Sequence, residues 1–134
     1  MRYSIAMKWI DALRSGEYMQ TKGALRDMNG FCCLGVLCNL HAQAHPEIAA
    51  EQQESHKYLG ESMSLPLDVI KWAGMQDLNG YGSFDKFPVD RKPTYDVSDK
   101  VEQRTAGSMT VLNDEAKWDF KKISTFIRKN YRYL

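Results

Sequence analysis

The segment that most constrains the fold is residues 31–44, Phe-Cys-Cys-Leu-Gly-Val-Leu-Cys-Asn-Leu-His-Ala-Gln-Ala. It is apolar on nearly all faces, long enough for a helix, and ends just before Pro46, whose ring disfavours helical backbone in the residue before it. A helix that is apolar all round is stable in a water-soluble protein when other elements cover it. The segment therefore predicts a buried central helix.

Four further helices are expected around this segment. Pro46 and Pro66 suit the first turn of a helix, whereas Gly16 and Gly74 are typical helix stops. The expected ranges are residues 3–14, 46–53, 64–74 and a last helix of roughly 16 residues that Asn113 and Asp114 cap. Apolar residues of the last helix recur three or four positions apart at Ala116, Phe120, Ile123, Ile127 and Tyr131.

Extended structure is expected in two stretches. Residues 17–27 lead to the Asn29 and Gly30 turn signal, so they predict a strand or extended arm followed by a turn. Residues 76–107 are interrupted by Gly and Pro, and both short strands and a long functional loop are compatible with them. The short candidate pieces are residues 84–87, 94–97 and 109–112. The predicted fold class is α+β: a small single domain over residues 1–134 with a buried central Cys-rich helix, a C-terminal amphipathic helix and a few short strands.

Composition favours a soluble protein. The 134 residues are 43% hydrophobic and 26% charged, which matches globular domains and argues against a disordered chain or a membrane span. The first residues lack a continuous apolar stretch, so no signal peptide is expected. Three cysteines form an odd count within seven residues, which favours a reducing compartment. We expect a cytoplasmic protein with no membrane partner.

The cysteine cluster allows three interpretations. Zinc binding with His41 would need a tetrahedral set, but Cys33 and Cys38 lie about 140° apart on a helix and no Cys-x-x-Cys pair exists. A nucleophilic Cys32 or Cys33 would gain from the helix dipole, with His56 as the base that could return to it. Buried cysteine otherwise behaves as a small hydrophobe. We predict a structural cluster, with no metal, no cofactor and no catalytic residue, because nucleotide-hydrolase, dinucleotide, zinc-protease and serine-hydrolase motifs are also absent from the sequence.

Polar residues between the first helix and the turn suit an anionic ligand that contains a base. Tyr18, Gln20 and Lys22 share one face if the segment is extended, and they combine a ring, an amide and a cation. A solvated hairpin face is the alternative. The helix start expected at residues 113–114 would add free N–H groups, and the Gly-rich residues 79–83 could display a stacking ring or form a plain turn. The predicted ligand-binding residues are Arg14, Tyr18, Gln20, Lys22, Arg26, Tyr81, Asn113 and Asp114.

Two features concern partners. The net charge of +1 hides a C-terminal group of five cations without a carboxylate side chain, which suits either an anionic partner or an ordinary solvated helix face. These cations are Lys121, Lys122, Arg128, Lys129 and Arg132. Three tryptophans, seven tyrosines and five phenylalanines exceed what one small core readily hides, and they predict a homo-oligomer, specifically a dimer.

Two strings carry a resemblance to known sequences. The pattern W-x-x-A-L-R-S-G-x-Y-x-Q over residues 9–20 and the string F-C-C-L-G-V-L-C over residues 31–38 resemble a family of small proteins found in bacteriophage genomes. The match extends to residues 23–26, 65–66, 70–74, 112–114 and 120–123, whereas residues 76–107 have no assigned counterpart. The resemblance carries no established activity.

The resemblance implies a biological context, that of a bacteriophage protein acting in its host cell. Small phage proteins without catalytic motifs often modulate host machinery, and some sequester nucleotide signals of antiviral defence. The leading hypothesis is a phage-encoded, non-enzymatic binding protein that sequesters a small anionic, nucleotide-derived immune signal in the host cytoplasm. The alternatives, in order, are a protein–protein inhibitor of a host defence enzyme, a Cys-dependent hydrolase, and nucleic-acid binding through the basic C-terminal helix.

Overall fold

The structure, a computed structural model, describes residues 1–51, 56–97 and 99–134. Its α-helices are α1 (Tyr3–Arg14), α2 (Cys33–Ala44), α3 (Pro46–Glu51), α4 (Leu67–Ala73), α5 (Met109–Asp114) and α6 (Phe120–Asn130). Two antiparallel hairpins pair β1 (Arg26–Asp27) with β2 (Gly30–Phe31), and β3 (Thr94–Asp96) with β4 (Gln103–Thr105). Single helical turns of the tighter 3-10 type are η1 (Val89–Arg91) and η2 (Tyr131–Tyr133). The mixture confirms the predicted α+β class.

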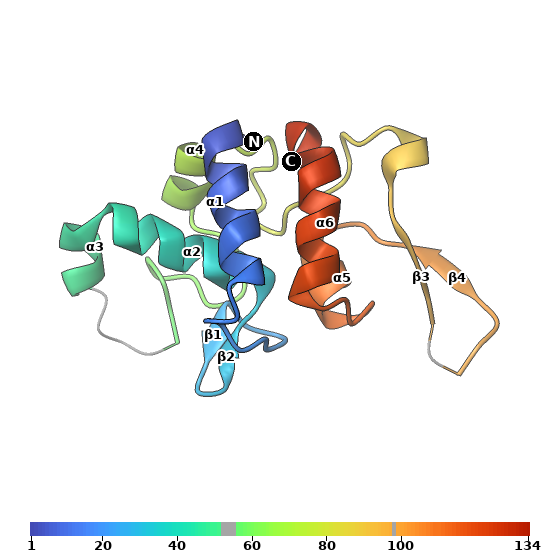
Figure 1. Cartoon of the computed structure of the whole chain (residues 1–134), viewed down its shortest axis with the longest axis horizontal. Helices are drawn as coiled ribbons and strands as arrows, with labels where there is room; N and C mark the ends of the chain where they lie inside the picture. Colours follow the sequence, from blue (N-terminus) through green and yellow to red (C-terminus); the bar gives the residue numbers. More distant parts are fainter. Residues whose placement is uncertain (52–55, 98) are drawn as a thin grey trace.

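The first half of helix α2 is buried, as its apolar sequence predicts, whereas Gln43 and Ala44 at its end are exposed. Residues 32–38 are buried, and α1, α4 and α5 pack around the helix (Figure 1). The indole N–H of Trp9 in α1 donates a hydrogen bond of 2.8 Å to the Cys33 carbonyl, which joins the two helices. The helix begins at Cys33 and not at Phe31, because Phe31 pairs with Arg26 in the first hairpin.

Backbone passes directly over backbone where the first hairpin meets α2. The Leu25 carbonyl accepts a hydrogen bond of 3.1 Å from the Cys32 N–H at the start of α2. One turn further along, a Cβ atom on Gly35 would overlap that same Leu25 carbonyl. A glycine is therefore required inside this helix by the close approach of the chain, although glycine weakens a helix by itself.

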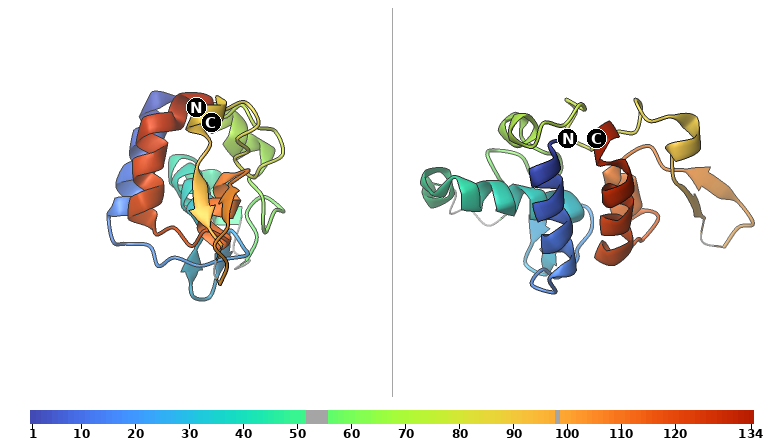
Figure 2. Two further views of the ribbon diagram at one scale, coloured as in Figure 1. Left: turned by 90° about the vertical axis from the view of Figure 1, so that its right-hand side faces the viewer. Right: turned by 45° about the horizontal axis from the view of Figure 1, so that its top comes forward.

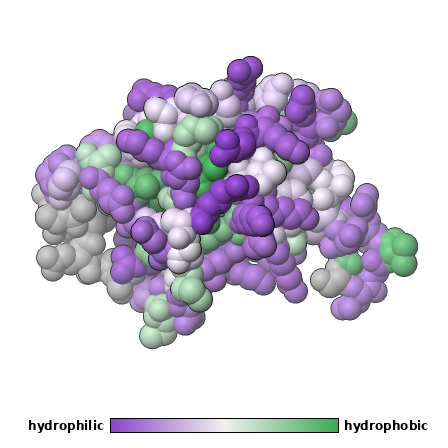
Figure 3. Space-filling view, viewed as in Figure 1, coloured by the Kyte–Doolittle hydropathy of each residue, from purple (hydrophilic) through white to green (hydrophobic). Residues whose placement is uncertain are grey.

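Helices α1 and α6 lie side by side on one face of the molecule (Figures 1 and 2). Each buries one side and exposes the other, and the exposed sides belong to a largely hydrophilic surface (Figure 3). The larger apolar side chains that the two helices bury are Ile5, Trp9, Ile10, Leu13, Phe120, Ile123, Phe126 and Ile127. The amphipathic character predicted for both helices is confirmed.

The predicted helix start at Asn113 and Asp114 is wrong. These residues end α5, whose N-cap is Ser108, and α6 begins separately after Asp119, whose carboxylate accepts a 2.7 Å hydrogen bond from the Lys122 N–H. Between the two helices Lys117 has a left-handed backbone with φ of 53°, which no continuous α-helix accommodates. The three- and four-residue spacing of apolar residues from Ala116 to Tyr131 therefore does not mark one continuous helix, because its first member lies in the connection before α6.

The short elements are partly as expected. Residues 109–112 are helical and residues 84–87 form a turn, so neither is a strand; the rings of Phe84 and Phe87 instead pack in the core 4.7 Å apart. Of the pieces compatible with short strands, residues 94–97 contain one, β3, which ends at Asp96. The helix expected over residues 46–53 is α3 up to Glu51, and the remainder of that range lies outside the described residues.

The β3–β4 hairpin projects from the helical body (Figures 1 and 2). At its base the buried Tyr95 donates a hydrogen bond of 3.0 Å from its hydroxyl to the Glu115 carboxylate. The strand β4 is exposed along its length. The hairpin therefore contributes Tyr95 to the core, while its exposed strand β4 helps to border a hollow next to α6.

Candidate functional site

The structure distributes the predicted ligand-binding residues over several places. Gln20, Asn113 and Asp114 belong to one hydrogen-bonded network, and Tyr18 and Arg26 lie against Phe31. The remaining three, which lie elsewhere, are Arg14 beside α6, the exposed Lys22, and Tyr81 in a turn packed against α5. Among the described residues, these eight do not come together around any one of the five pockets that the structure shows most clearly.

Asn113 is the centre of the network. Only 1% of its surface is exposed, and its Oδ1 accepts hydrogen bonds from Gln20 Nε2 at 2.9 Å and from the Cys33 N–H at 3.1 Å. Its Nδ2 donates to the Thr21 carbonyl at 2.8 Å and to Asp114 Oδ1 at 2.7 Å. All the hydrogen-bonding capacity of the side chain is thus used within the protein. The network fixes the extended arm to α5 and α2, and it leaves Asn113 nothing to offer a ligand.

Arg14 and Tyr81 have local roles. The Arg14 guanidinium donates to Ser124 Oγ at 2.7 Å and to Thr125 Oγ1 at 3.0 Å, which joins the end of α1 to α6. The Tyr81 carbonyl accepts a hydrogen bond of 3.4 Å from the Thr110 N–H, while its side chain is 43% exposed. Neither residue lies in the pocket described next.

A pocket of about 160 Å³ lies between the first hairpin, α2 and residues 56–58. Its floor is apolar and comes mainly from Leu25 and α2. The polar and aromatic residues that line it are Arg26, Phe31, Asn39, His56, Lys57 and Tyr58. We call it the hairpin pocket. Of the eight predicted residues, Arg26 alone is among those that line it.

Tyr18 supports the hairpin pocket without lining it. Its ring packs edge-on against Phe31, with centroids 5.2 Å apart, and its hydroxyl accepts a 2.7 Å hydrogen bond from Asn39 Nδ2. Tyr18 therefore holds two of the lining side chains in place. It was predicted to stack on the ligand directly, whereas here the ring on the pocket surface is that of Phe31.

The hairpin pocket has a positive lining. Arg26 and Lys57 are exposed and His56 lies beside them, and among the described residues that line the pocket there is no carboxylate. Across residues 1–51, 56–97 and 99–134, the ion pair that occurs is Arg104 with Glu102, so neither Arg26 nor Lys57 has an ion-pair partner there. The Arg26 guanidinium carbon is 5.6 Å from the centre of the Phe31 ring. The pocket thus places free cations next to an aromatic face.

The nearest acidic residue along the hairpin is engaged in the turn. Asp27 accepts hydrogen bonds from the Thr21 hydroxyl at 2.6 Å, the Asn29 N–H at 2.8 Å and the Gly30 N–H at 3.0 Å. These bonds, chiefly that from Thr21, lower the pKa of the Asp27 carboxyl group. Its charge therefore stabilises the predicted Asn29 and Gly30 turn, which the structure confirms.

Tyr58 is fixed from behind the pocket by a buried histidine. Its hydroxyl is 2.6 Å from His41 Nδ1, and burial raises the pKa of Tyr58 to about 12, so the hydroxyl carries its proton at neutral pH. Burial lowers the pKa of His41, which favours the neutral imidazole. A neutral imidazole can accept a hydrogen bond from the Tyr58 hydroxyl at Nδ1. His45 stacks on His41 at 4.2 Å and Trp72 packs edge-on at 5.2 Å.

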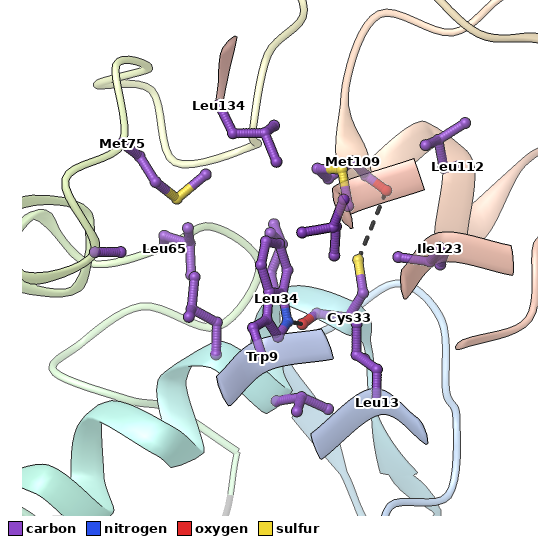
Figure 4. Close-up of a cluster of buried hydrophobic side chains, with 14 of the residues drawn as sticks. Trp9, Leu13, Cys33, Leu34, Leu65, Met75, Met109, Leu112, Ile123 and Leu134 are labelled. Atoms are coloured by element: carbon purple, nitrogen blue, oxygen red, sulfur yellow. Dashed lines mark hydrogen bonds between the residues drawn. The ribbon is translucent and has the colours of Figure 1, made fainter. Parts of the chain in front are cut away.

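The cysteines have the surroundings of core residues. All three are buried, and burial raises the pKa of Cys32 to about 11 and raises the pKa of Cys33 and Cys38 as well. Cys33 Sγ lies 3.8 Å from the Met109 carbonyl within the apolar cluster (Figure 4). A reactive cysteine needs a lowered pKa and access to solvent. Within the described parts of the chain, no three potential metal ligands gather.

Sequence reasoning missed most of the hairpin pocket. Asn39 belongs to the segment predicted as the apolar central helix, and residues 56–58 lie outside all the helices and strands that the sequence predicts. A weak signal existed, since His56, Lys57 and Tyr58 put a cation beside an aromatic ring in a short segment. Their position against α2 depends on tertiary contacts such as that between Tyr58 and His41.

Comparison with known proteins gives one match. Residues 1–131 match the sequence model of a family described as "Domain of unknown function (DUF8296)". No curated protein and no solved structure matches. Among the described residues, no helix has the length and apolar character needed to cross a membrane. The chain belongs to the DUF8296 family.

Proposed function

We propose that this protein binds, without cleaving it, a small anionic ligand that carries an aromatic ring, and that the hairpin pocket holds this ligand. The observation that carries the proposal is the pair of free cations, Arg26 and Lys57, beside the rings of Phe31 and Tyr58. Guanidinium and ammonium groups bind phosphate, and aromatic side chains stack on nucleobases. A nucleotide combines both features in one molecule.

The size of the pocket narrows the ligand class. At about 160 Å³ it is smaller than the roughly 300–1,000 Å³ of most sites for drug-sized ligands. It suits one base or one phosphorylated end better than a complete oligonucleotide. We propose a mononucleotide or the terminal unit of a short nucleotide signal as the ligand, with the rest of a longer ligand lying outside the pocket.

Binding is favoured over hydrolysis by the state of the thiols. Burial raises the pKa of Cys32 and Cys33, and the Nδ1 atom of His41 is engaged by Tyr58. The bacteriophage-like sequence pattern supports a role in the cytoplasm of an infected host cell, where the ligand would be a nucleotide signal of antiviral defence. The predicted dimer remains part of the proposal, and sedimentation as a 15.4 kDa monomer at high micromolar concentration would contradict it.

Calorimetry with nucleotides, together with mass spectrometry of what heat releases from protein incubated in a cell extract, tests this function. A sequestering protein should release the nucleotide intact. Arg26→Ala and Lys57→Ala should each weaken binding about 10- to 100-fold, the range for a charged hydrogen bond. Lys22→Ala is the matched control because Lys22 is an exposed cation outside the pocket lining. Unchanged affinity in both pocket variants, or release of a cleaved nucleotide, would refute the proposal.

A further inference from the structure

Helix α6 carries a second cationic surface that the hairpin pocket does not use. Lys121, Lys122, Arg128 and Lys129 are exposed on the helix, and Arg132 follows it. The face of the molecule on which α6 lies is largely hydrophilic (Figure 3). Arg14 reaches the edge of this surface through its hydrogen bond of 3.0 Å to Thr125 Oγ1.

Three hollows follow one another along α6 and share lining residues, and we call this row of hollows the α6 furrow. The hollow next to the second hairpin has a volume of about 380 Å³ and shares Trp118 and Lys122 with a middle hollow of about 480 Å³. The middle hollow shares Lys129 with a third hollow of about 300 Å³ at the C-terminal end. Since α6 has 11 residues, the furrow spans roughly 16 Å of helix axis. A track of this length suits a linear molecule better than a compact one.

The furrow has a strong excess of positive charge. Its lining cations are Arg91, Lys117, Lys121, Lys122, Arg128, Lys129 and Arg132. Its lining carboxylates are Asp96 and Asp119, and Asp119 is engaged as the N-cap of α6. None of the seven cations forms an ion pair in the part of the chain that the structure describes. A row of cations that lack ion-pair partners among the described residues complements a chain of phosphates.

Aromatic side chains alternate with these cations. Trp118 is partly exposed in the middle of the furrow, with Lys122 Nζ 4.2 Å from the centre of its ring. Tyr131 and Tyr133 line the C-terminal hollow. Rings among cations are the usual surface for single-stranded nucleic acid, because unpaired bases stack on them while the backbone follows the charges. An acidic protein would need no ring, and a duplex keeps its bases stacked inside.

We propose that the α6 furrow binds single-stranded nucleic acid, with phosphates on Lys121, Lys122 and Lys129 and a base stacked on Trp118. The proposal does not depend on a ligand in the hairpin pocket, which is lined by none of these residues. It gives the protein a second binding activity, directed at a polymer and independent of sequence.

Fluorescence anisotropy of the full chain with a labelled, mixed-sequence DNA strand of about 15 nucleotides tests the proposal between about 50 and 200 mM salt. The logarithm of the affinity should fall linearly with the logarithm of salt concentration. A variant with Lys121→Ala, Lys122→Ala and Lys129→Ala should reduce that slope by about 2, or about 0.7 for each lost phosphate contact. Trp118→Leu should weaken binding about 5- to 100-fold with little change in slope, and Trp118→Phe, which keeps a ring, should weaken it less.

The matched control removes three exposed cations outside the furrow, by Lys8→Ala, Lys71→Ala and Lys100→Ala. Its net charge equals that of the furrow variant, and its affinity should stay close to wild type. Equal losses in both triple variants, equal affinity for duplex DNA of the same sequence, or equal competition by polyglutamate would overturn the proposal. Arg26→Ala should leave DNA binding unchanged, which separates failure here from failure of the nucleotide pocket.

Discussion

The Asn113 network and the hairpin pocket use similar residue types in opposite ways. In the network, the oxygen and the nitrogen of the Asn113 side-chain amide and a carboxylate oxygen of Asp114 all form hydrogen bonds within the protein. In the pocket, Arg26 and Lys57 meet no ion-pair partner within the described residues. The polar groups of the Asn113 network hold segments of the protein together, whereas Arg26 and Lys57 in the hairpin pocket stay accessible to solvent. Hydrogen-bond saturation, more than residue type, distinguishes the scaffold from the proposed binding site.

The largest effect is expected from Asn113→Ala. It leaves the buried Cys33 N–H and the Thr21 carbonyl without their partner, so the free energy of unfolding should fall by about 2–4 kcal/mol. Asn39→Ala provides a matched amide from the pocket, with one hydrogen bond to Tyr18, and should cost about 1 kcal/mol. Urea unfolding of both variants measures the difference. Equal losses would abolish the distinction between the two regions.

A smaller effect is expected from Cys33→Ala, which tests whether the buried thiols belong to the scaffold. The Cys33 side chain is fully buried, and its loss should lower the free energy of unfolding by an amount on the order of 1 kcal/mol. Nucleotide binding should persist in calorimetry. Loss of activity in a variant with the unfolding midpoint of wild type would instead assign Cys33 to a functional site.

The pH dependence of stability tests the contact behind the pocket. Burial and, secondly, His45 lower the pKa of His41, while Asp68 and Glu47 act in the opposite direction. Because the unfolded chain then binds the proton more readily, the contribution of His41 to stability is present above pH of about 6.5 and is lost as pH falls through the lowered pKa. Unfolding between about pH 7.5 and 5 should show this loss, and His41→Gln should reduce it. A pH dependence unaltered by His41→Gln would refute the assignment.

The smallest effect on stability is expected from Lys57→Ala. Its side chain is exposed and has no ion-pair partner among the described residues, so the free energy of unfolding should change by less than about 0.5 kcal/mol. Thermal unfolding of Lys57→Ala, compared with that of Asn113→Ala and of wild type, measures the change in stability. A comparable loss in the two variants would mean that the pocket cation is structural.

The fold was more predictable from sequence than the site. The run of apolar residues around Leu34 and Leu37 can be stable in water only if other parts of the chain cover it, so it correctly predicted a buried segment of helix. The break before α6 was not predictable from periodicity, because it depends on the left-handed backbone of Lys117, a residue with no special preference for that conformation.

For the candidate site, local signals identified one residue of the pocket. Arg26 stands next to a recognisable turn, so its exposure could be anticipated. Asn113 has the chemistry of a helix cap wherever it occurs, but its partners Gln20 and Cys33 lie 93 and 80 residues away in the chain. Lys57 and Tyr58 likewise reach the pocket through contacts with α2 that no local pattern encodes.

The contact between Gly35 and the Leu25 carbonyl has a consequence for selectivity. Both residues line the hairpin pocket, and where they meet, main chain lies against main chain with no side chain between. No rotamer change can deepen the pocket at that point, since none of the touching atoms belongs to a side chain. A bulkier ligand would have to be accommodated elsewhere in the pocket, by movement of side chains such as Arg26 and Lys57. If the hairpin pocket binds the proposed ligand, its depth at this point is set by the peptide backbone, which would limit the size of the group that enters there.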